Sequence, residues 1–168
     1  MSEWPAKLEI TAEQFDSMDG DALFERIGPW SFGALVDKGR CPSRVFQLTA
    51  SGYWIWTEAA NGGIEQYFTN GAIGAEYIPE VLDLLGRGKA IPLFELAAAQ
   101  IPKGYAGWDL DDRWNFASEN PVINGISDEF WNFLDDATFA KDFAVFVRQH
   151  RFEFEPFLKS ESGNDSLH

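Results

Sequence analysis

The stretch that decides the fold is residues 43–70, SRVFQLTASGYWIWTEAANGGIEQYFTN. Its first part carries apolar side chains on almost every side of a helix, which is typical of a helix at the centre of a core. These side chains are Val45, Leu48, Tyr53, Trp54, Ile55, Trp56, Ala59 and Ala60. Asn61-Gly62-Gly63 then interrupts the pattern, which resumes at residues 64–68. We therefore expect a bent helix, or a pair of helices, around Asn61-Gly63.

Shorter helical patterns flank this central segment. Thr11-Ala12-Glu13-Gln14 has the form of a capping box and predicts a first helix, and a second one begins near Ala22 and is stopped or kinked by Gly28-Pro29. Further helices are expected over residues 79–86, 92–100, 109–118 and 127–150. No region alternates with the period of a strand. The sequence predicts one compact all-α domain over residues 1–158 and a mobile polar tail over 159–168.

Composition and charge bound the function. The 168 residues suit one domain, and the 45% hydrophobic content supplies a core. The 27 acidic residues against 13 basic ones leave a net charge of −14. Because nucleic acids and anionic lipids repel such a charge, we expect neutral or positive partners, with no direct nucleic-acid or membrane binding.

The residue inventory excludes several kinds of site. Cys41 is the only cysteine, so the chain has no intramolecular disulfide and no multi-thiolate zinc site. With only His150 and His168, no histidine-based metal site can be assembled, and no phosphate-binding glycine motif occurs. No N-terminal basic and apolar leader and no apolar membrane span is present. We expect a cytoplasmic protein without a cofactor.

The negative charge is clustered in two parts of the sequence. Residues 1–25 hold seven acidic residues against Lys7, and residues 105–142 hold nine against Arg113 and Lys141. Within the expected last helix, Asp128, Asp135 and Asp142 repeat every seven residues and would form one stripe, spaced by about 10.5 Å.

From this local charge density we predict a partner-binding face. Its residues are Asp111, Asp112, Asp128, Asp135, Asp136 and Asp142. Exposed aromatic side chains among Trp108, Trp114 and Trp131 would supply apolar anchors, although packing in the core is the alternative use of each. An ordinary solvated acidic surface is the alternative to a binding face.

Residues 61–70 read NGGxxQYFxN, and here the chain resembles a bacterial family of mostly uncharacterised all-helical domains whose best described member is an acidic DNA-mimic protein. The likeness covers residues 43–150, and Ile64 stands where an aromatic residue is common. The resemblance implies a dimeric decoy that occupies the DNA-binding surface of a transcription factor.

The same motif has a physical interpretation of its own. Ile64, Tyr67 and Phe68 share one side of a helix, whereas Gln66 and Asn70 share the opposite side. The glycines allow a close turn, so the amides can satisfy backbone groups that the bend frees. We interpret the motif as structural, with a ligand pocket as the alternative. Its residues are Asn61, Gly62, Gly63, Gln66, Phe68 and Asn70.

An enzymatic function has weaker support. Asp109-Leu110-Asp111-Asp112 begins like a calcium loop, but Trp114 replaces the turn glycine and Asn120 replaces the bidentate glutamate. Glu58 and Glu65 flank the bend and are the alternative, as the acid and base of a small hydrolase.

The function that the sequence favours is therefore non-enzymatic: binding the basic surface of a transcription factor or another DNA-binding protein as a DNA mimic. The alternatives are an immunity-type inhibitor of a nuclease and the small hydrolase. Possible homodimer formation follows only from the resemblance.

Overall fold

A computed structural model describes residues 7–36, 43–135 and 137–160. Within these residues the secondary structure is helical, apart from one isolated parallel β-bridge between Thr11 and Lys159. The α-helices are α1 (Ala12–Ser17), α2 (Gly20–Ser31), α3 (Gly33–Val36), α4 (Arg44–Thr69), α5 (Ile78–Leu84), α6 (Ile91–Ala98), α7 (Leu110–Glu119), α8 (Pro121–Leu134), α9 (Phe139–Gln149) and α10 (Arg151–Phe154). The predicted all-α fold is confirmed.

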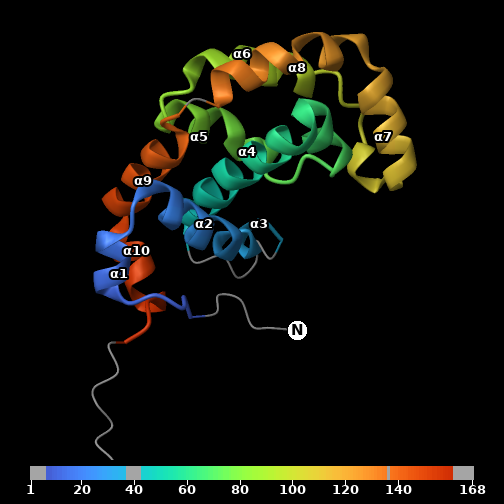
Figure 1. Cartoon of the computed structure of the whole chain (residues 1–168). Helices are drawn as coiled ribbons and strands as arrows, with labels where there is room; N and C mark the ends of the chain where they lie inside the picture. The colour runs from blue at the N-terminus through green and yellow to red at the C-terminus, as the bar shows by residue number, and fades with distance from the viewer. Residues whose placement is uncertain (1–6, 37–42, 136, 161–168) are drawn as a thin grey trace, which may run out of the picture.

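Helix α4 is the centre of the fold, as predicted. It contacts α2, α3, α5, α7 and α8. Its residues Phe46, Ile55, Ile64 and Tyr67 are fully buried. In Figure 1, α4 runs through the middle of the molecule, with α1 and α10 at one end and α7 at the other.

The predicted bend lies at the glycine pair. Gly62 has φ −171° and ψ 32°, and Gly63 has φ 73° and ψ −176°, so neither residue is helical. A Cβ atom on Gly63 would lie 2.3 Å from Ser127 Oγ. Both its positive φ and this close approach therefore require glycine at position 63.

The first two helices differ in how well the sequence predicts them. The capping box is present, because Thr11 N–H donates to Gln14 Oε1 at 2.9 Å and Gln14 N–H donates to Thr11 Oγ1 at 3.2 Å. Gly28-Pro29 does not stop the second helix, since α2 continues to Ser31, two residues past Pro29. Proline lacks the N–H that would donate four residues back, so α2 loses one backbone hydrogen bond at Pro29 and ends two residues later.

The single helix predicted over residues 127–150 is also wrong. The structure ends α8 at Leu134 and begins α9 at Phe139. The buried Arg87 guanidinium holds this break, because Nε donates to Leu134 O and Nη2 donates to Thr138 Oγ1, both at 3.1 Å. Since Asp128 and Asp142 lie on different helices and Asp135 between them, the predicted stripe on one helix does not exist.

The N-terminal and C-terminal segments pack against each other. Leu8 N–H donates to Phe157 O at 2.7 Å, and Lys159 N–H donates to Ile10 O at 2.9 Å. The Phe15 and Phe154 ring centroids are 5.8 Å apart. Of the predicted polar tail, Lys159 thus contacts the domain, and residues 161–168 lie outside the described residues.

The bend gives a first prediction. Replacing Gly63 with alanine should lower the free energy of unfolding by about 1–3 kcal/mol, because alanine resists a φ of 73° and its Cβ would meet Ser127 Oγ. The control is Gly125→Ala in α8, where a Cβ atom would meet nothing within 4 Å. This substitution should raise the free energy of unfolding by about 0.5–1 kcal/mol. Urea denaturation measures both, and equal effects of the two substitutions would contradict the required turn.

Candidate functional site

A buried carboxylate lies at the bend of α4. Glu58, only 4% exposed, precedes the bend, and it accepts hydrogen bonds from the side-chain amides of Asn70 and Gln66, which follow the bend. In a straight helix, Glu58 and Asn70, twelve positions apart in sequence, would be about 18 Å apart along the axis. The turn at the glycine pair therefore brings the two sides of this contact together.

Burial has the largest effect on the pKa of the Glu58 carboxyl. Removal from water raises the pKa of this carboxyl above its ordinary value, and the hydrogen bonds from Asn70 and Gln66 lower it in part. The net shift is upward. The folded protein therefore binds a proton at Glu58 more readily than a free glutamate does.

The amides of the motif thus bind a carboxylate, where the sequence led us to expect backbone partners. The backbone N–H of Ile64, which the bend frees, donates instead to Ser127 Oγ at 3.2 Å. Ser127 in turn donates its hydroxyl hydrogen to the carboxylate of Glu65. Glu58 and Glu65 are therefore bound by different groups. Neither carboxylate lines a hollow beside the bend.

Two hollows lie beside the bend, one against α8 and one against α7. The first, of about 260 Å³, includes among its lining residues Asn61, Gly62, Gly63, Ser127, Asp128 and Trp131. The second, of about 240 Å³, is lined by Gln66, Thr69, Asn70, Leu110, Asp111 and Trp114. Each hollow joins residues of the motif to one predicted acidic residue and one predicted tryptophan. The structure thus brings Asp111 and Asp128 to the bend.

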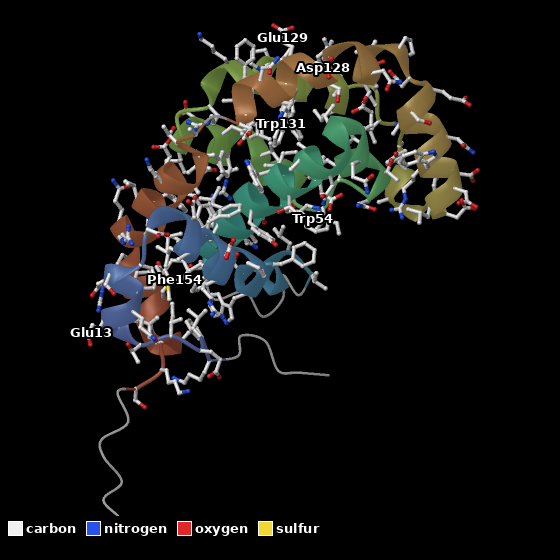
Figure 2. All side chains as sticks on the ribbon, in the orientation of Figure 1. Glu13, Trp54, Asp128, Glu129, Trp131 and Phe154 are labelled. Atoms are coloured by element: carbon white, nitrogen blue, oxygen red, sulfur yellow. The ribbon has the colours of Figure 1, made fainter. Side chains whose placement is uncertain are left out.

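We call the exposed carboxylates on or next to α7 and α8 the α7–α8 acidic surface, and two of them, Asp111 and Asp128, line the hollows. The carboxylates of this surface are Asp109, Asp111, Asp112, Glu119, Asp128 and Glu129. The structure shows no ion pair between any of them and a described lysine or arginine. In Figure 2, Glu129 points away from the core whereas Trp131 lies between α8 and α4. Leu110, 54% exposed, and Trp114, 52% exposed, add apolar area to this surface.

The remaining predicted face residues lie elsewhere. Asp135 is half-buried and accepts from Trp56 Nε1 at 3.0 Å. Asp142 is 3.0 Å from Arg87 Nη2 and accepts from Thr138 Oγ1 at 2.8 Å. Asp136 lies outside the described residues. The structure therefore groups Asp111, Asp112 and Asp128 on α7 and α8, but it does not place Asp135 and Asp142 with them as free carboxylates.

Part of the acidic cluster of residues 1–25 lies at the other end of the molecule. Helix α1, which carries Glu13 and Asp16, is far from α7 in Figure 1. Part of this cluster is neutralised, because Asp16 pairs with Arg151 at 2.9 Å and Glu9 pairs with Lys159 at 3.2 Å. The α7–α8 acidic surface is thus the less neutralised of the two.

The described residues show two further absences. No group of three or more histidine, cysteine, aspartate or glutamate residues among them is placed to hold a metal ion. The helices that they form include none with the length and apolar character needed to cross a membrane.

The fold and this surface define a small, acidic, all-helical domain. The chain belongs to the DMP19-like protein family, whose family model matches residues 45–150. Comparisons with curated proteins and with solved structures found no match. The matched range begins in α4 and leaves out α1, α2 and α3, although α2 packs against both α4 and α9.

The amide contacts give a second prediction. Asn70→Ala should lower the free energy of unfolding by about 1.5–3 kcal/mol, because it removes a hydrogen bond to a buried carboxylate. The matched control is Asn132→Ala, an exposed amide on α8, which should change stability by less than about 0.5 kcal/mol. The measurement is urea denaturation, and an unchanged midpoint for Asn70→Ala would contradict a structural role.

The raised pKa of Glu58 gives a third prediction. A carboxyl whose folded pKa lies above its unfolded pKa adds stability as the pH falls through the folded value, because the folded state binds more protons. The wild-type protein should therefore gain stability relative to Glu58→Gln between about pH 7 and pH 4.5. Parallel denaturation curves of the two proteins measure this difference. A difference that stays constant with pH, or falls, would show that the Glu58 pKa is not raised.

Proposed function

We propose that this protein is a non-enzymatic DNA mimic that binds the basic DNA-binding surface of a transcription factor or another DNA-binding protein. The observation that carries the proposal is the α7–α8 acidic surface, whose exposed carboxylates form no ion pairs with described residues. Free carboxylates can accept charge-assisted hydrogen bonds from the lysine and arginine side chains that otherwise bind phosphates.

Apolar groups among the carboxylates favour a protein partner over small counterions. Leu110 and Trp114 are half exposed and share a hollow with Asp111. Tryptophan is enriched among the residues that dominate binding energies at protein interfaces, usually inside a polar rim. The arrangement therefore suits an apolar centre on the partner with lysine and arginine around it.

Three arginines of the described chain are engaged away from this surface. Arg87 is buried at the break between α8 and α9, Arg148 donates to Met18 O, and Arg151 pairs with Asp16 and Glu155. These contacts tie three arginines to other parts of the fold. The net charge of −14, which already counts every lysine and arginine, attracts a basic partner.

Membership in the DMP19-like family supports the same proposal through the resemblance to an acidic DNA mimic. A homodimer would enlarge the acidic area. Two copies would carry 2 × −14, or −28, which corresponds to about 48 Å of duplex DNA.

Capture from the native cell tests the proposal. The protein should retain a basic DNA-binding protein at about 0.05 M salt and lose most of it at about 0.5 M, because salt screens exposed charges. Duplex DNA should compete with the captured protein for binding. Capture that ignores ionic strength, or captured proteins that are not basic, would contradict the proposal, and a captured nuclease without other DNA-binding proteins would favour the inhibitor alternative.

Charge variants locate the surface and give a fourth prediction. Asp111→Asn with Asp112→Asn and Asp128→Asn should weaken binding of the captured protein about tenfold, at about 0.5 kcal/mol for each exposed charge. The control has the same net charge but neutralises exposed carboxylates on three other helices, namely Glu13→Gln, Asp83→Asn and Glu95→Gln. Isothermal titration with the captured protein measures both, and equal losses would show that α7 and α8 are not the binding surface.

A further inference from the structure

An aromatic pocket of about 490 Å³ opens between α2, α4 and α9, outside the α7–α8 acidic surface. Its size falls within the range of about 300–1,000 Å³ that is typical of ligand pockets. Phe24 from α2, Tyr53 and Trp56 from α4, and Phe139 from α9 supply its aromatic lining. The three helices lie together in Figure 1. Asp21 and Glu25 of α2 also line the pocket.

The aromatic rings are held in place by one another and by polar contacts. The Phe24 ring centroid is 5.3 Å from that of Tyr53, 5.1 Å from that of Trp56 and 5.9 Å from that of Phe139. Trp56 stacks on Phe139 at 6.0 Å, and the Trp56 indole N–H donates to Asp135 at 3.0 Å. The lining is therefore preformed, which lowers the entropy lost on binding.

A glycine also shapes the pocket. A Cβ atom on Gly28 of α2 would lie 2.1 Å from the Tyr53 ring, so the ring packs against α2 where a side chain would otherwise stand. The glycine that the sequence suggested as a helix stop thus makes room for one of the aromatic side chains of the pocket.

The two carboxylates give the pocket its charge. Asp21 and Glu25 are exposed and four residues apart, so they lie one helical turn apart on the same side of α2. The structure shows no ion pair between either of them and a described basic residue, including Arg26 and Lys141, their neighbours on α2 and α9. The pocket therefore combines an aromatic lining with unneutralised negative charge.

We propose that this pocket binds an arginine side chain of the basic protein partner. This inference rests on the proposed function, because it takes the partner to be basic. A guanidinium stacks on aromatic faces and has several N–H donors in a planar fork, which suits two carboxylates one turn apart. The apolar stem of the arginine covers the rings while its charge stays at Asp21 and Glu25.

Two neighbouring indole rings link the pocket to the hollow against α8. The Trp56 ring centroid is 6.1 Å from that of Trp131, and Trp131 lines the hollow that also contains Asp128. We therefore expect a partner that contacts Trp131 on α8 to reach the pocket beside Trp56 as well. The pocket anchors the partner, and the exposed carboxylates of α7 and α8 extend the contact.

Binding of octa-arginine and octa-lysine peptides, measured by isothermal titration, tests the pocket. Asp21→Asn with Glu25→Gln should weaken octa-arginine binding about tenfold, whereas Asp83→Asn with Glu95→Gln, which has the same net charge, should weaken it less than about threefold. Octa-lysine should bind the wild-type protein at least about threefold more weakly than octa-arginine. Equal losses in the two charge variants, or equal binding of the two peptides, would overturn the pocket as an arginine site.

A second variant fills the pocket without changing the charge. Ala140 of α9 lines the pocket, and Ala140→Leu should weaken octa-arginine binding about tenfold while the unfolding midpoint confirms that the variant folds. Unchanged binding in folded Ala140→Leu would overturn the proposal. If the captured DNA-binding partner binds both Asp21→Asn with Glu25→Gln and Ala140→Leu as tightly as the wild-type protein, the pocket is not an arginine site and the proposed function stands. If both variants weaken octa-arginine binding as expected and no DNA-binding protein is captured, the pocket is an arginine site and the proposed function is wrong.

Discussion

The buried carboxylate of Glu58 is the constraint on which the rest of the structure depends. A carboxylate removed from water is strongly unfavourable unless hydrogen-bond donors surround it. Asn70 and Gln66 can supply these donors only if the chain turns back after Gly62 and Gly63. The turn sets the direction of the end of α4, against which α7 and α8 pack. The acidic surface that we propose for partner binding therefore lies where this contact places it.

Local sequence signals predicted the elements that depend on nearby residues. The glycine pair and the apolar periodicity around it predicted the bent central helix, and Thr11 with Gln14 predicted the start of α1. The break between α8 and α9 could not be predicted in this way. It depends on Arg87, which lies 47 residues before Leu134 in sequence and reaches that carbonyl only in the folded chain.

The same difference between nearby and distant contacts explains which parts of the candidate site could be predicted. Charge density along the sequence identified Asp111, Asp112 and Asp128, which the structure shows to be exposed, but it could not identify which carboxylates are engaged inside the fold. Asp135 binds an indole and Asp142 binds a buried guanidinium, and both partners come from distant parts of the sequence. The aromatic pocket was missed for the same reason, because α2, α4 and α9 each supply only part of its lining.

The pairing of residues 8–10 with residues 157–159 has a practical consequence for handling the protein. Leu8 is hydrogen bonded to Phe157, and α1 and α10 lie at the end of the molecule that is far from α7 in Figure 1. An affinity tag, a fluorescent reporter or a surface linkage enters the described part of the chain at Lys7 or Ser160, and both of these residues line one hollow at that same end. A molecule attached to a support at this end would keep α7 away from the support and exposed to solution.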